Sequence, residues 1–196
     1  MAMADGVHGL MRPLACAHDW VERVLVPGDS AVDATAGNGY DTLFLARLVG
    51  PSGHVHAFDV QAAALEETRR RLMREGCGER VSLHECSHSR MREAVPDGVK
   101  AVMFNLGYLP GSDHAVKTVK EETVPAVQAA SELLLPGGVL TVMCYPGHEG
   151  GREECEAVEE FLESLPLPQW RVVRLASANG SSDAAFLLAA LRVPGK

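Results

Sequence analysis

Two apolar runs of the chain each end in an acidic residue, at a spacing typical of nucleotide-binding enzymes. The first run ends in Asp33 and continues into a turn with the sequence Ala-Gly-Asn-Gly at residues 36–39. The second run ends in Asp59, about twenty residues after that turn. Glycine lets the backbone approach a ligand closely, and a carboxylate after the second strand can accept hydrogen bonds from two ribose hydroxyls. The pattern predicts the first βαβ unit of a nucleotide-type binding fold.

The turn lacks the third glycine of a dinucleotide-binding fingerprint, because Thr42 stands where that glycine is expected. A turn without a pyrophosphate cradle, combined with a ribose-binding acid, favours S-adenosylmethionine (SAM) over NAD as the cofactor. Gln61 follows Asp59 by two residues and either contacts the ligand or caps the next helix. The expected cofactor-binding residues are Asp33, Ala36, Gly37, Asn38, Gly39, Asp59, Gln61, Ser87, His88 and Asn105.

The loop after the fourth apolar run carries the residues expected to hold a substrate. From Phe104 to Asp113 it reads Phe-Asn-Leu-Gly-Tyr-Leu-Pro-Gly-Ser-Asp. This density of Asn, Gly, Tyr, Pro and Asp favours a functional loop, with a structural turn as the alternative. The loop after the fifth run contains His148, which either contacts a substrate or belongs to a helix entry. The expected catalytic residues are Asn105, Tyr108, Asp113 and His148.

Short apolar runs alternate with helical patterns, and these elements must position the loops. The expected strands cover residues 30–34, 54–58, 80–84, 100–104, 139–144, 171–175 and 185–193, and the expected helices cover 13–25, 40–48, 62–75, 90–95, 118–135 and 153–165. This order predicts an α/β fold with a doubly wound, Rossmann-like sheet, mostly parallel with an antiparallel C-terminal edge hairpin. We expect one domain over residues 1–196, with residues 1–27 as a helical lead-in. Ligands of such sheets bind at the carboxyl ends of the strands.

Composition limits the classes of partner and compartment. The net charge of −8 argues against non-specific binding of a nucleic-acid backbone, although it leaves room for a local basic patch. Four arginines lie close together at positions 69, 70, 71 and 74, a pattern that is usually a solvated helix face. The five cysteines are scattered without CxxC spacing, which predicts reduced thiols, a cytoplasmic protein and no metal site. No apolar run approaches the roughly 18 residues of a membrane span.

Five segments of the chain, at residues 33–42, 58–61, 87–88, 104–113 and 147–151, resemble the bacterial family labelled "putative rRNA methylase". Members of that family resemble the SAM-dependent tRNA 5-aminomethyl-2-thiouridine methyltransferase. The resemblance spans about residues 28–192, and its most specific string is Asn-Leu-Gly-Tyr-Leu-Pro-Gly at residues 105–111. It implies a class I methyltransferase that uses SAM to methylate the amino group of 5-aminomethyl(2-thio)uridine at the tRNA wobble position.

The resemblance also implies roles for single residues. The family's SAM contacts correspond to Asn38, Asp59, Gln61, Ser87 and His88. The loop at residues 104–113 is similar to the Asn-Pro-Pro-aromatic loop of enzymes that methylate nitrogen, so Asn105 would orient the amine and Tyr108 would stack on the base. The chain departs from these patterns at Leu106-Gly107, which replaces the two prolines, at His114, which replaces a family lysine, and at Ala184-Ala185, which replaces a second proline pair.

Three alternatives stay open at this point. The chain could be an rRNA methyltransferase with the same machinery, an NAD-dependent oxidoreductase, or a SAM- or RNA-binding module without catalytic activity. In the favoured reading the partner is RNA, with the tRNA anticodon loop as the expected contact and no membrane involved. A homodimer is a possible assembly.

Overall fold

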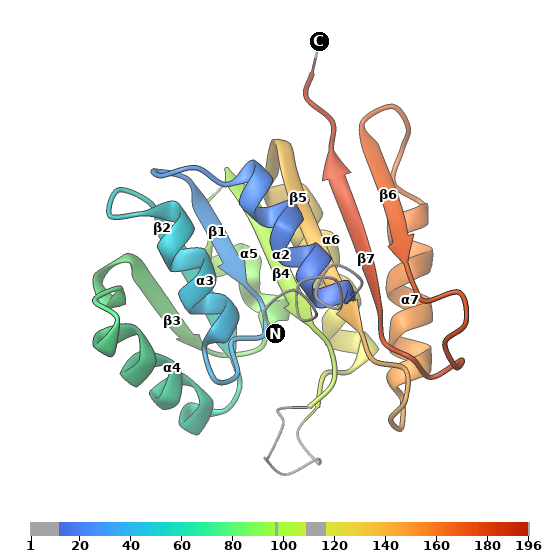
Figure 1. Cartoon of the computed structure of the whole chain (residues 1–196), viewed down its shortest axis with the longest axis horizontal. Helices are drawn as coiled ribbons and strands as arrows, with labels where there is room; N and C mark the ends of the chain where they lie inside the picture. The colour runs from blue at the N-terminus through green and yellow to red at the C-terminus, as the bar shows by residue number, and fades with distance from the viewer. Residues whose placement is uncertain (1–11, 97, 109–116, 196) are drawn as a thin grey trace, which may run out of the picture.

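The computed structural model describes residues 12–96, 98–108 and 117–195, and these residues form a seven-stranded sheet flanked by helices (Figure 1). The strands are β1 (Ser30–Asp33), β2 (His54–Asp59), β3 (Val81–Glu85), β4 (Val99–Asn105), β5 (Leu134–Cys144), β6 (Trp170–Leu175) and β7 (Phe186–Arg192). The α-helices are α2 (Pro13–Val24), α3 (Tyr40–Val49), α4 (Ala62–Arg74), α5 (Met91–Ala94), α6 (Lys120–Leu133) and α7 (Gly151–Glu163), with short 3₁₀ turns η1 (Gly78–Arg80) and η2 (His88–Arg90).

The strand order is β3-β2-β1-β4-β5-β7-β6. The first five strands pair in parallel, and β7 runs antiparallel to both β5 and β6. The expected doubly wound sheet with a C-terminal antiparallel hairpin is therefore confirmed, with β7 inserted between β5 and the edge strand β6. Parallel pairing brings the carboxyl ends of β1 to β5 to one edge of the sheet, where their loops meet.

Helices cover both faces of the sheet because the side chains of each strand alternate between them. On one face, Ala31 of β1 and Met103 of β4 pack in a cluster with residues of α2, α3 and α4. On the other face, Val32 and Phe104 pack in a cluster with residues of α5, α6 and α7. Figure 1 shows these helices as two layers around the sheet. None of the described helices is both long and apolar enough to span a membrane.

The structure differs from the sequence prediction at the start of β5. The sequence predicts a helix over residues 118–135 and a strand over 139–144, with Pro136-Gly137-Gly138 between them as a helix stop, but α6 ends at Leu133 and β5 begins at once with Leu134. Between the pairs Val99↔Leu134 and Ala101↔Val139, β4 advances two residues while β5 advances five. The Pro-Gly-Gly segment therefore bulges within the strand. A bulge of this kind needs glycine, because Gly137 adopts a φ of +80°.

Candidate functional site

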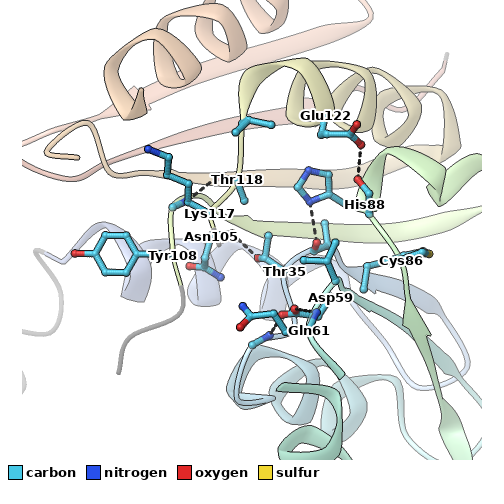
Figure 2. Close-up of a pocket in the computed structure, with 17 residues that line it drawn as sticks. Thr35, Asp59, Gln61, Cys86, His88, Asn105, Tyr108, Lys117, Thr118 and Glu122 are labelled. Carbon is cyan, nitrogen blue, oxygen red and sulfur yellow. Dashed lines mark hydrogen bonds between the residues drawn. The ribbon is translucent and has the colours of Figure 1, made fainter. Parts of the chain in front are cut away.

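A cavity of about 350 Å³ lies at the carboxyl ends of β1 to β4 and against the start of α6. Its wall combines glycine, carboxylate, amide, imidazole and hydroxyl groups with apolar side chains. The lining residues are Ala34, Thr35, Gly37, Phe58, Asp59, Val60, Gln61, Cys86, Ser87, His88, Asn105, Gly107, Tyr108, Lys117, Thr118, Val119 and Glu122. Figure 2 shows Asp59 and Gln61 on one side, Thr118 and Glu122 on the opposite side, and Asn105 between them.

Asp59 is held in the cavity wall by the backbone on both of its sides. Its Oδ2 accepts a hydrogen bond from the Gly37 N–H at 2.9 Å, and its Oδ1 accepts one from the Gln61 N–H at 2.8 Å. Each carboxylate oxygen can accept more than one hydrogen bond. Both oxygens are thus fixed in position while they keep capacity for hydroxyl groups of a ligand. Gln61 is also the first residue before α4, but its side chain makes no capping hydrogen bond and lines the cavity instead.

Asp33, expected as a cofactor ligand, does not line the cavity. Its side chain is completely buried, where it accepts hydrogen bonds from the Thr35 N–H at 3.1 Å and the Thr42 hydroxyl at 2.6 Å. Burial raises the pKa of Asp33 to about 7, and the nearby Asp41 carboxylate adds to that shift. Asp33 therefore fixes the turn between β1 and α3 and lies behind the wall of the cavity.

The other residues of the turn divide between the cavity and the packing of the helices. Gly37 lines the cavity, whereas Ala36, Asn38 and Gly39 do not. Gly39 has a φ of +76°, and a Cβ at this position would lie 2.7 Å from the Thr68 hydroxyl of α4. This glycine is required because the turn and α4 approach each other closely, which is a packing function rather than a ligand contact.

We predict that Asn in place of Asp33 flattens the pH dependence of stability. The pKa of Asp33 is about 7 in the folded protein and has its ordinary value of 3.8 in the unfolded chain, so the folded protein binds this proton more tightly. The stabilisation from this group is therefore complete below about pH 4 and is lost as the pH rises toward 7. Between about pH 5 and 8, the melting temperature of Asp33→Asn should fall less than that of the wild type. Asp19→Asn, an exposed carboxylate on α2, is the control; identical slopes for all three proteins would contradict the prediction.

Asn105 ends β4 and is held by two hydrogen bonds, one to the turn after β1 and one to α3. Its backbone N–H donates to the Thr35 hydroxyl at 2.7 Å, and its side-chain Nδ2 donates to Asp41 Oδ2 at 2.7 Å. The second oxygen of Asp41 lies 2.7 Å from His18 Nε2, and the His18 ring stacks on Phe44. A carboxylate only accepts hydrogen bonds, so Asp41 turns the amide nitrogen toward itself. The carbonyl oxygen of Asn105 is then left without a donor among the described residues and is available to the cavity.

The two ends of the loop after β4, at residues 107–108 and 117–118, pair with each other. The Gly107 N–H donates to the Thr118 hydroxyl, the Thr118 N–H donates to the Gly107 carbonyl, and Tyr108 forms an antiparallel bridge with Lys117. The Thr118 hydroxyl in turn donates to the buried Glu154 carboxylate at 2.8 Å, whose pKa is raised by burial. This arrangement fixes both ends of the loop. Asp113, expected as a catalytic residue, lies outside the described residues.

His148 does not reach the cavity, although it was expected at the substrate side. Its ring packs against the backbone of Gly107, where a Cβ would lie 3.2 Å from His148 Nε2. It also makes an edge-on contact with the Tyr108 ring, with 5.9 Å between the ring centroids. His148 therefore contacts Tyr108, which lines the cavity, rather than the cavity itself.

Ser87 and His88 both line the cavity, and Figure 2 shows His88 on the same side of the cavity as Cys86. The two ring nitrogens of His88 lie 3.1 Å from the Ala34 carbonyl and 3.4 Å from the Thr123 hydroxyl. Burial lowers the pKa of His88, so the ring is neutral at pH 7. Both ring nitrogens thus contact protein groups, and the ring forms part of the cavity wall.

The hydroxyl of Ser87 donates to Glu122 at 2.5 Å, and Ser89 also donates to this carboxylate. These two hydrogen bonds hold the pKa of Glu122 below its usual range. Glu122 is therefore an ionised acceptor at the end of the cavity opposite Tyr108.

Sequence reasoning missed several residues of this site. Thr35, Lys117, Thr118 and Glu122 line the cavity, while Asp41 and His18 lie behind Asn105. Asp41 belongs to the segment 33–42 that carries the family resemblance, but the sequence does not show that it contacts Asn105. Nothing in the local sequence marked Glu122, because it reaches the cavity only through the position of the first turn of α6 in the fold. Among the described residues, no group of three His, Cys, Asp or Glu side chains is arranged to hold a metal ion, and the expected lack of a metal stays a prediction.

Known proteins that resemble the chain share both its sequence pattern and its fold. A family model described as "Putative rRNA methylase" matches residues 55–190. The chain is 40% identical over 182 residues to the chloroplastic tRNA (mnm(5)s(2)U34)-methyltransferase of Arabidopsis thaliana; the match covers 87% of this chain and 66% of the length of that protein.

Two solved structures agree with the chain over almost their whole length. A "putative rRNA-methylase" from Clostridium thermocellum is 40% identical, with a TM-score of 0.90 and coverage of 93% of this chain and 98% of that one. A "putative methyltransferase" from Streptococcus mutans, solved in complex with SAH, is 34% identical, with a TM-score of 0.84 and the same coverage.

Proposed function

The chain belongs to the family described as "Putative rRNA methylase", and from this membership and the site geometry we propose that it is a SAM-dependent RNA methyltransferase. The proposed reaction methylates the amino group of 5-aminomethyl(2-thio)uridine at the wobble position of tRNA. The observation that carries it is the Asn105 side chain, whose nitrogen is fixed on Asp41 so that its oxygen is left for an amine. The fold prediction agrees with this family, whose solved members share the sheet.

SAM would occupy the cavity between Asp59 and Glu122. The Asp59 carboxylate, fixed by two backbone N–H groups, would accept hydrogen bonds from both ribose hydroxyls. Ser87 and Glu122 would face the adenine edge, where an ionised carboxylate is a suitable acceptor for the exocyclic amino group. Gly37 would allow the amino-acid end of SAM to approach the backbone. SAM supplies an electrophilic methyl group on its sulfonium sulfur.

The protein's contribution to the reaction is alignment. Asn105 Oδ1 would accept a hydrogen bond from an N–H of the neutral amine and so direct the nitrogen lone pair toward the methyl group. The N–C bond forms as the S–C bond breaks, the sulfonium charge passes to nitrogen, and a proton then leaves the ammonium for water. A neutral amine is already a good nucleophile, so placing it correctly provides most of the acceleration. Tyr108 would stack on the uracil ring.

The tRNA substrate is supported by the name of the Arabidopsis relative, and by the accessibility of anticodon-loop bases, which can leave their stack. The second candidate is an rRNA substrate, which the family description favours. Nucleoside mass spectrometry of tRNA from cells with and without the protein separates the two. Accumulation of the unmethylated 5-aminomethyl nucleoside in its absence supports the proposal, and unchanged tRNA nucleosides overturn it.

Ligand-induced stabilisation tests the cofactor separately. A ligand at a hundred times its dissociation constant stabilises the fold by about 2.7 kcal/mol, which a melting curve resolves easily. We therefore expect SAM and its demethylated product to raise the melting temperature, whereas NAD at the same concentration leaves it unchanged. A shift with NAD and none with SAM would instead support the oxidoreductase alternative.

Compartment and assembly stay predictions. None of the five cysteines, all of which lie among the described residues, forms a disulfide, as expected of a cytoplasmic protein. A homodimer remains a prediction that light scattering tests.

Asn38 and Ala36 remain candidates for backbone contacts with SAM.

A further inference from the structure

The arginine run of α4 is not uniform in its contacts. Arg69 pairs with Glu66 at 3.6 Å and Arg70 pairs with Glu67 at 3.2 Å, both one helical turn apart, and Arg74 lies 3.9 Å from Glu75. Exposed pairs of this kind form an ordinary solvated helix face. Arg71 differs from these three, because none of the described carboxylates forms an ion pair with it. Its positive charge is therefore not neutralised by a neighbour.

Arg71 is fixed against the glycine turn instead. Its Nε donates to the Asn38 carbonyl at 2.7 Å, and its guanidinium carbon lies 3.7 Å from the centroid of the Tyr40 ring. One nitrogen is used in this way, and the two terminal nitrogens keep donors for another group. Tyr40 is 67% exposed, and the Arg71 guanidinium holds its ring in place from one face.

The Arg71–Tyr40 pair lies beside the proposed active site. Asn38, which accepts the Arg71 hydrogen bond, directly follows the cavity residue Gly37. Tyr40 directly precedes Asp41, the residue that holds Asn105. The exposed Tyr40 ring at the start of α3 and the Arg71 guanidinium of α4 thus contact each other beside the turn between β1 and α3, which supplies the cavity residue Gly37.

We propose that this pair binds a single-stranded segment of RNA, with Tyr40 stacking on a nucleobase next to the target nucleotide and Arg71 binding the adjoining phosphate. This inference rests on the proposed function, because it supplies the RNA contact that the methyl transfer requires. The chemistry is that of single-strand recognition, in which aromatic faces stack on bases and arginine binds the backbone. Since the net charge of the chain is −8, the surface as a whole does not attract the RNA backbone, and a local cation such as Arg71 is needed to bind a phosphate.

The test measures RNA and SAM affinity in parallel on the full chain. The RNA probes are a fluorescent, unmethylated anticodon stem-loop and a fluorescent single-stranded oligouridine; SAM binding is followed by calorimetry. Tyr40→Ala should weaken binding of both RNAs about tenfold or more, while Tyr40→Phe binds as the wild type does, because stacking needs the ring and not the hydroxyl. SAM affinity should change less than about threefold in either variant.

The charge is tested by the salt dependence of RNA binding. Loss of one phosphate contact to a single strand reduces the slope of log K against log salt by about 0.7. Arg71→Met should show this reduction. Arg70→Met, which removes a neighbouring charge already paired with Glu67, should not.

Two outcomes would overturn the inference. In the first, Tyr40→Ala binds RNA like the wild type. In the second, its SAM affinity falls as much as its RNA affinity, which would make the pair a brace for the glycine turn. Failure of the proposed function is seen elsewhere: a wild type that binds both RNAs through Tyr40 but never methylates the stem-loop removes the function and keeps the RNA site.

Discussion

Replacing Asn105 by alanine should reduce the rate of methyl transfer to tRNA about 100-fold or more while SAM still binds. The reason is that Asn105 is proposed to hold the reacting amine, and misplacement of a reacting group by about 1 Å can cost 10²-fold. Because the contact is proposed to act mainly in the transition state, kcat and kcat/KM should fall together. Single-turnover kinetics on unmethylated tRNA measure the rate. Calorimetry measures SAM affinity, which should stay within about threefold of the wild-type value.

Asp41 provides the matched comparison, because it contacts Asn105 and does not line the cavity. Asp41→Ala frees the Asn105 amide to rotate, so it should slow methyl transfer by less than Asn105→Ala does. If Asp41 acts through Asn105, the double variant should be no slower than Asn105→Ala alone, since residues in one network are not additive. Wild-type rates in a folded Asn105→Ala protein would exclude the amine-positioning role.

The sheet could be predicted from sequence because its signals are local. Apolar runs such as His54–Asp59 alternate with amphipathic helices, and this order predicts parallel strands with right-handed connections. The end of α6 was misjudged because Pro-Gly-Gly is a common helix stop. Whether such a segment ends a helix or bulges inside a strand depends on the partner strand β4, which the local sequence does not contain.

Site residues could be predicted where a side chain lies directly at a strand end. They could not be predicted where the role of a side chain depends on a partner that is distant in the sequence. Asp59 and Asn105 follow apolar strands and do line the cavity. Asp33 also lies at the end of such a strand, but it is completely buried and its two local hydrogen bonds stabilise the turn after β1. His18 lies 23 residues from its partner Asp41 and in a helix that the sequence indicated only as a lead-in.

The second large effect is expected at Asp59. Asp59→Ala removes a charged acceptor from two ribose hydroxyls, and each hydrogen bond to a charged group contributes roughly 1.5–3 kcal/mol. SAM affinity should therefore fall at least tenfold by calorimetry. The fold should survive, because the Gly37 and Gln61 N–H groups that lose their acceptor border a cavity large enough to admit water. Circular dichroism checks the fold.

A loss of affinity in Asp59→Ala alone does not prove a ribose contact, since the same change releases the backbone of Gly37 and Gln61. A ligand with one hydroxyl removed separates the two explanations. The wild type should bind S-adenosylhomocysteine more tightly than its 2′-deoxy analogue, because the analogue lacks one of the two hydroxyls that are proposed to donate to Asp59. Asp59→Ala should bind both ligands equally, since the group that distinguished them is gone. If the variant still prefers the hydroxylated ligand by the wild-type factor, Asp59 supports the turn only, and the ribose must be held by another residue of the wall, with the neighbouring Gln61 side chain as the first to test.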